Sequence, residues 1–205
     1  MAEFLDIYDA NKKHIGTADR NVAHAFGLWH KTVHCWIVWR GKMVFQRRSR
    51  TMTANAGKLY TTASGHISAG ESVEQAFARE IVQEIGISVV NPRQISETTW
   101  VADIKKSDGS LFIDRVFANV FWADFDGELT DFHFDDGEVD SVVAVDLDEF
   151  VNFARGKSIV VKGMEFDGKT VSEINLAESD FVINEGETLH GKYGANAEYI
   201  QNSIH

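Results

Sequence analysis

The chain has 205 residues, of which 44 % are hydrophobic and 25 % are charged, a composition typical of a soluble globular protein. Its net charge of −11 argues against binding to DNA or RNA polymers, because a strongly acidic surface repels polyanions, but it does not exclude a small phosphorylated ligand. The single cysteine argues against a disulfide framework, and we find neither a long apolar run nor a leader-like start, so we expect a cytoplasmic protein without a membrane segment.

Short strands are predicted in the first part of the chain. Residues 3–8 alternate between apolar and polar side chains, and residues 9–16 read as a turn with a returning strand. Residues 32–39 are rich in β-branched and aromatic side chains, and the Arg40-Gly41 turn joins them to residues 42–46. This second pair of strands predicts a hairpin.

A helix is predicted over residues 72–85. Ser72 is a typical N-cap residue, and Gln75 three positions later completes a capping-box pattern. Apolar residues then recur at four-residue spacing, at Val73, Phe77 and Ile81. Gly86 ends the helix.

The remaining predicted elements complete an α/β pattern. Strands are expected at residues 59–62, 95–104, 111–121 and 139–145, a turn at 105–109, and helices at 147–155 and 195–204. Strands before and after a central helix, with another helix late, predict a mixed β-sheet between helical layers. We expect one domain over residues 1–205, with a core over about 3–156 and a C-terminal extension over about 157–205, and a homodimer is compatible with this composition.

Two acids of the central helix predict a metal site. Glu80 and Glu84 are four residues apart, so they lie on one helix face, one turn from each other. Two carboxylates this close repel each other, and the next three residues bring no Lys or Arg. A hard divalent cation with oxygen ligands, Mg²⁺ or Mn²⁺, satisfies both.

The residues around this helix resemble a known motif, the Nudix box. Its pattern is Gly, five residues, Glu, seven residues, Arg-Glu, an aliphatic residue, any residue, Glu-Glu, any residue, Gly and an aliphatic residue. The chain matches it from Gly65 to Ile87, except that Gln83 replaces the first acid of the Glu-Glu pair. The resemblance implies an α/β/α sandwich and a Mg²⁺-dependent hydrolase of diphosphate linkages, a pyrophosphohydrolase.

The resemblance also implies roles for the residues of the box. Glu84 is expected to be the principal metal ligand, and Glu80 a further ligand or the base that activates water. Gly65 is expected to offer its backbone carbonyl to the metal, since glycine allows close approach. Arg79 is expected to orient the acids, with Glu71 as its partner, although the two also suit an ordinary surface ion pair.

Gln83 leaves the expected metal site one charge short. Its amide oxygen can coordinate a metal, but it contributes no charge. Glu138 is the best compensating ligand, because in the family an acid just before the late strand often binds metal. The run from Asp135 to Glu138 is equally typical of a solvated acidic turn.

A narrower resemblance is to the isopentenyl diphosphate isomerase-like branch of the Nudix proteins. It rests on the layout of several short pieces, Gly16–Arg20, His24, Gly27, His30, Phe45–Ser49, Ser64–His66 and Gly70-Glu71. Isomerases protonate a double bond with a cysteine just before the Gly-His pair, and Ser64 stands at that position, which disfavours isomerisation. Isomerases also bind a metal through histidines near these places, so His24, His30 and His66 form either a metal site or three structural side chains.

The residues that contact substrate are less defined. Phosphate contacts are expected from basic residues after the strand predicted at residues 42–46, namely Arg47, Arg48, Arg50 and Lys58. Strand alternation would put Arg47 and Arg48 on opposite faces. Core packing is favoured over base stacking for Trp29, Trp36 and Trp39.

These observations predict a hydrolase of small-molecule diphosphates, with nucleoside di- or triphosphates or their derivatives as substrates. Two alternatives remain. One is an enzyme similar to isopentenyl diphosphate isomerase. The other is a catalytically weak Nudix fold that senses a ligand, which the replacement at Gln83 suggests.

Overall fold

Among the described residues, nine strands form one mixed sheet. The computed structural model describes residues 3–52, 55–105, 109, 111–135, 137–184 and 186–204. The order across the sheet is β11 (Val171–Leu176), β10 (Val161–Phe166), β9 (Val139–Asp146), β4 (Lys42–Arg48), β3 (His30–Trp39), β8 (Leu111–Asp124) and β7 (Arg93–Lys105). Two short strands, β5 (Leu59–Tyr60) and β6 (Ala63–His66), pair with β4 and β3 respectively.

The centre of the sheet is built on the predicted hairpin. Trp39 pairs with Lys42 across a two-residue turn, and Arg40 and Gly41 both have positive φ, of 50° and 73°. This left-handed turn matches the twist of the two strands. β3 also pairs in parallel with β8, while its other partners are antiparallel, so the sheet is mixed as predicted.

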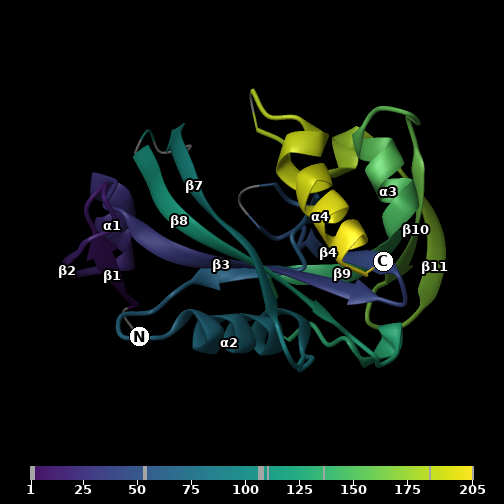
Figure 1. The fold of residues 1–205 in the computed structure, drawn as a ribbon, viewed down its shortest axis with the longest axis horizontal. Helices are drawn as coiled ribbons and strands as arrows, with labels where there is room; N and C mark the ends of the chain where they lie inside the picture. The colour runs from purple at the N-terminus through teal and green to yellow at the C-terminus, as the bar shows by residue number, and fades with distance from the viewer. Residues whose placement is uncertain are drawn as a thin grey trace.

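Helices cover both faces of the sheet (Figure 1). α2 (Val73–Ile85) lies on one face, and α3 (Leu147–Ala154) and α4 (Ala195–Ile204) lie on the other. Alternation along β3 produces this division, because Val33, Cys35 and Ile37 pack in the cluster that contains α2. Trp36 and Val38 pack in the second cluster, with the two other helices.

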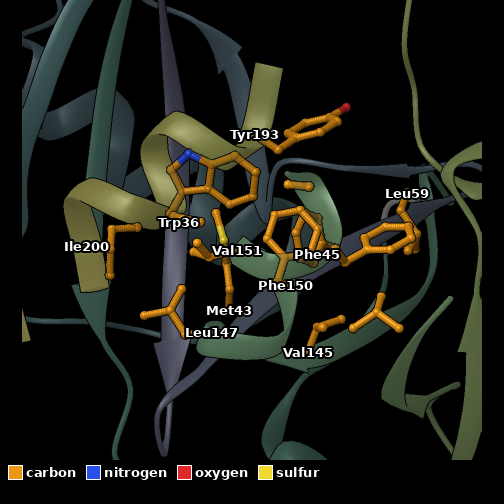
Figure 2. Packing of buried hydrophobic residues seen from close by; sticks show 14 of the residues in the cluster. Trp36, Met43, Phe45, Leu59, Val145, Leu147, Phe150, Val151, Tyr193 and Ile200 are labelled. Atoms are coloured by element: carbon orange, nitrogen blue, oxygen red, sulfur yellow. The ribbon is translucent and has the colours of Figure 1, made fainter. Parts of the chain in front are cut away.

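Figure 2 shows the second cluster from close by, with the indole of Trp36 near Phe45, Phe150 and Tyr193. Tyr193 and Ile200 come from the C-terminal extension, and both are fully buried. The extension therefore supplies part of the core. The two helical layers confirm the predicted α/β/α sandwich with a mixed sheet.

Several elements differ from the sequence prediction. The strand expected at residues 59–62 is shortened to the two residues of β5, and β6 begins only at residue 63. α1 (Arg20–Phe26), β6, β10 and β11 were not predicted from the sequence. β1 (Phe4–Tyr8) and β2 (His14–Asp19) form the expected pair, as a separate two-stranded sheet.

Other parts of the chain are single turns or lie outside the description. Short turns of 3-10 helix occur at Leu129–Asp131 and Glu178–Asp180, and a π-helical turn at His190–Gly194 leads into α4. The turn expected at 105–109 lies largely outside the described residues. Of the helices in the described ranges, none has the length and apolar character that crossing a bilayer requires.

Candidate active site

α2 presents its two acids at the border of its buried face. Ser72 caps the helix, its hydroxyl accepting from the Gln75 N–H while the Gln75 side chain accepts from the Ser72 N–H, and Gly86 ends it with φ of 69°. Apolar residues of this helix pack on the sheet, and Glu80 and Glu84 lie one turn apart beside them, only 8 % and 7 % exposed. Buried carboxylates need partners, and each acid has them.

Glu84 is fixed by the sheet. Its Oε2 accepts hydrogen bonds from the Gln46 side-chain amide at 3.0 Å and from the Ser64 backbone N–H at 3.1 Å. These donors come from β4 and β6, so the carboxylate bridges the helix to both strands.

Glu80 lies directly against Gly65. A Cβ at Gly65 would be 2.0 Å from Glu80 Oε1 and 2.1 Å from Glu80 Cδ, so only glycine leaves room for this carboxylate. Arg79 Nη1 donates to Glu80 Oε1 at 2.6 Å. Burial raises the pKa of Glu80, and the charge of Arg79 opposes part of that rise.

Arg79 connects the start of α2 to its acids. The guanidinium forms a bidentate pair with Glu71, both N···O distances being 2.8 Å. It also donates to the His66 carbonyl at 2.9 Å and to the Gln83 side-chain oxygen at 3.1 Å. The hydrogen bond from Arg79 lowers the pKa of Glu71, so this pair is charged at neutral pH. The geometry fits an orienting role for Arg79.

The acids open onto a cleft of about 410 Å³. It is lined by Glu80, Gln83, Glu84, Asp135 and Glu138. Four carboxylates and an amide oxygen form a donor set that suits a hard divalent cation. Glu138 was predicted to join the site and lies there; Asp135 of the same acidic run lines the cleft as well, while Asp136 is outside the described residues.

Among the described residues, the lining of the cleft includes none of the four basic residues expected at phosphate. Arg47 pairs with Glu165 of β10 at 2.5 Å and donates to the Gly57 carbonyl, and Lys58 Nζ donates to the Ser179 carbonyl.

A register shift lies opposite the two adjacent arginines. Arg47 is paired with Ser141 and Arg48 with Val139, so the extra residue, Asp140, belongs to β9. Burial raises the pKa of Tyr60 to about 12, and the nearby Arg48 charge opposes the rise, so Arg48 lies within electrostatic reach of this ring. Arg50 is exposed, with its backbone N–H bound to Asp140.

A separate cluster of three histidines lies on the side of β6 away from the acidic cleft. The three histidines predicted as a metal site or as structural groups come together: one ligand atom each of His24, His30 and His66 lies within 4.8 Å of the others. His24 Nε2 is 3.1 Å from His66 Nε2. Burial lowers the pKa of His66 to about 2, which keeps its imidazole neutral, the form that binds metals.

Asp114 of β8 completes this cluster, and the sequence analysis missed it. Its Oδ1 is 3.4 Å from His24 Nδ1 and 3.6 Å from His30 Nε2. The His30 Nδ1–H points to the Leu28 carbonyl at 2.9 Å, which directs Nε2 toward the cluster. Among the described residues, His30 Nε2 and Asp114 Oδ1 are buried and lack hydrogen-bond partners. Three imidazoles and a carboxylate are a donor set for a transition metal or zinc.

Comparison with known proteins identifies the family. A family model described as the NUDIX domain matches residues 28–162. An uncharacterized Nudix hydrolase of Clostridium acetobutylicum is 30 % identical over 200 residues, covering 94 % of this chain and 92 % of the relative. An isopentenyl-diphosphate Delta-isomerase of Serratia proteamaculans is 30 % identical over 129 residues, covering 62 % of this chain and 69 % of the relative.

A solved structure shares the fold. The crystal structure of a Deinococcus radiodurans protein has a TM-score of 0.55 at 17 % identity, covering 75 % of this chain and 90 % of that one. The α/β/α layers and the acidic helix define a Nudix domain. The chain belongs to the Nudix family, whose members generally use divalent metals such as Mg²⁺.

Proposed function

We propose that the protein is a Mg²⁺- or Mn²⁺-dependent hydrolase of diphosphate linkages in small molecules, with nucleoside di- and triphosphates or their derivatives as substrates. One observation supports this most directly. Glu80 and Glu84 are held in fixed positions at one acidic cleft, by Arg79 and by Gln46 with Ser64. Carboxylates placed so rigidly at an opening are typical of metal-dependent phosphate chemistry.

The acids have separate roles in the proposal. Glu84 and Glu138 would hold the cation, with Gly65 offering its carbonyl and Gln83 its amide oxygen. A divalent cation bound there would neutralise phosphoryl oxygens and make water more acidic. Glu80 is either a further ligand or the base: burial raises its pKa, which makes its carboxylate a stronger base toward the attacking water.

Contacts to the phosphates are proposed for Arg50, which is exposed just after β4. A guanidinium fits phosphate oxygens in a bidentate manner. Arg47 binds Glu165, Lys58 binds the Ser179 carbonyl, and the Arg48 charge acts on Tyr60, so these three residues are assigned to the fold around the site.

The test is a screen of metal-supplemented protein against nucleotides, nucleotide sugars, coenzymes and isoprenoid diphosphates, with products resolved by phosphorus NMR. We expect Mg²⁺-dependent turnover that falls at least about 100-fold in Glu84→Gln. Glu74→Gln is the matched control, because Glu74 lies exposed in the first turn of the same helix. If no compound is hydrolysed while one still raises the melting temperature, the protein is a ligand sensor instead.

The histidine cluster favours a second candidate, an isomerase-like metal centre. We propose that His24, His30, His66 and Asp114 bind a divalent transition metal or zinc. The metal content of purified protein should fall in Asp114→Asn and His66→Ala and stay unchanged in the exposed His133→Ala. Isomerisation itself requires a proton donor that Ser64 does not provide, so we expect isopentenyl diphosphate to exchange no protons with solvent.

A further inference from the structure

A second cavity lies on the face of the sheet opposite α2. Its volume is about 420 Å³, and residues of β3, β7, β8 and the segment 186–196 line it. His34 of β3 points to the same face as Trp36, which packs in the cluster that contains Ala197 and Ile200 of α4. The C-terminal extension thus forms one wall of this cavity, which is separate from the acidic cleft.

A partly buried charge pair and three aromatic rings form part of this cavity. The Lys192 side chain is 9 % exposed and that of Glu187 21 %, and Lys192 Nζ is 2.9 Å from Glu187 Oε2. The same ammonium lies 4.7 Å from the ring centre of Trp100, 5.7 Å from that of Tyr60 and 5.9 Å from that of Tyr193. The cavity wall thus places a cation and an anion side by side next to aromatic rings.

The wall of the cavity carries further polar side chains. Thr61, Thr98 and Asn196 line it and add hydrogen-bond donors and acceptors beside the charge pair.

We propose that this cavity binds a neutral heteroaromatic ring with an adjacent carbonyl and N–H, the edge of an oxopurine or of uracil. Lys192 donates to the ring carbonyl, Glu187 accepts from the ring N–H, and the face of Trp100 stacks on the ring. Since Lys192 and Glu187 cancel in charge and burial lowers the pKa of His34 to about 4, the walls favour a neutral group. This inference rests on the proposed function, because the ring would be the base of a nucleotide substrate.

β6 connects the cavity to the acidic cleft. His34 pairs with Ser64 across the strands, and the Ser64 N–H holds Glu84 on the other side. The Glu84 charge also contributes to the raised pKa of Tyr60, whose ring lines the cavity. β6 is therefore the strand that the cavity and the acidic cleft have in common.

The test uses nucleosides, which carry no phosphate, in EDTA. Inosine and uridine are titrated against adenosine and cytidine by calorimetry, with indole fluorescence as a second signal. We expect inosine and uridine to bind at least tenfold more tightly, because a site built on a donor and an acceptor rejects the inverted edge. Quenching should disappear in Trp100→Phe, since that indole contacts the ring.

Two variants test the charge pair. Lys192→Met should weaken inosine binding at least tenfold, and Glu187→Gln, which keeps the side-chain volume, should reduce the preference for uridine over cytidine. Lys169→Met is the control, since Lys169 is exposed on the β10–β11 turn. The inference is overturned if none of the four nucleosides binds, or if Lys192→Met binds as wild type does.

The two proposals fail separately. If the protein hydrolyses a diphosphate but binds no nucleoside, the proposed base pocket is refuted and the proposed hydrolase activity stands. If it binds a nucleoside but hydrolyses no diphosphate, the proposed pocket stands and the proposed hydrolase activity is refuted.

Discussion

The Gly65→Ala variant tests whether the acidic cleft requires a glycine at this position of β6. Gly65 has no positive φ, so alanine can adopt its backbone conformation, and the new methyl group is the only disturbance. That methyl would lie 2.0 Å from Glu80 Oε1, whereas an ordinary contact begins near 3.4 Å. The carboxylate must therefore retreat by about 1.4 Å.

This displacement should cost far more activity than stability. A misplacement of about 1 Å at reacting groups can reduce the rate about 100-fold, so we expect a fall in kcat of that order. Moving one side chain off its preferred rotamer costs only about 0.5–1.5 kcal/mol, and losing the bond to Arg79 adds a similar amount. We expect the free energy of unfolding to fall by about 1–3 kcal/mol.

Three measurements check this prediction: Mg²⁺-dependent turnover of a substrate from the screen, Mn²⁺ binding by electron paramagnetic resonance, and urea unfolding. Gly163→Ala is the matched control, because its methyl would meet Val143 at 2.8 Å in the same sheet, away from the cleft. Glu80→Asp in the Gly65→Ala background shortens the acid by one methylene and should restore part of the Mn²⁺ affinity. Activity within twofold of wild type in Gly65→Ala would refute the reasoning.

Three further predictions concern neighbouring groups. Arg79→Lys should lower stability by about 1–2 kcal/mol and activity at least about tenfold, because lysine cannot form the bidentate pair with Glu71. Arg93→Lys is the control, because Arg93 is in an exposed ion pair, and it should change stability by less than about 0.5 kcal/mol in the same urea titrations. Equal losses of stability in the two variants would contradict the role assigned to Arg79. Gln83→Glu adds a charge at the cleft and should tighten Mg²⁺ binding about tenfold by calorimetry, so an unchanged affinity would place residue 83 outside the reach of the metal. The pKa of His34 is lowered to about 4 from 6.5, so between these pH values the unfolded chain binds a proton that the folded chain does not, and stability falls as pH falls. The loss is at most about 3 kcal/mol, less where water enters the cavity, and His34→Gln should flatten unfolding free energies measured from pH 7 to 4.5; an unchanged slope would contradict it.

The acidic helix could be predicted because its signals are local. The cap at Ser72, the apolar spacing and the glycine stop all act within one helix, and they place Glu80 and Glu84 on one face. The hairpin of β3 and β4 was predicted for the same reason, since Arg40 and Gly41 determine its turn.

Groups assembled by strand pairing were harder to predict. Asp114 joins the histidines because β8 runs parallel to β3 with Val116 opposite His30, and no local pattern reveals that register. Arg47 was expected at phosphate, but its partner Glu165 belongs to β10, a strand whose sequence, Val-Lys-Gly-Met-Glu-Phe, has no regular apolar alternation. The α1 helix, with only seven residues, offers too little periodicity to detect.

In β6, the backbone and the side chain of Ser64 face different neighbours. Ser64 contributes its backbone N–H to Glu84, while its side chain shares a face with His34. Any amino acid except proline supplies that N–H. The side chain at this position can therefore diversify during evolution and change the chemistry on one face of the sheet, while the carboxylate on the other face keeps its donor.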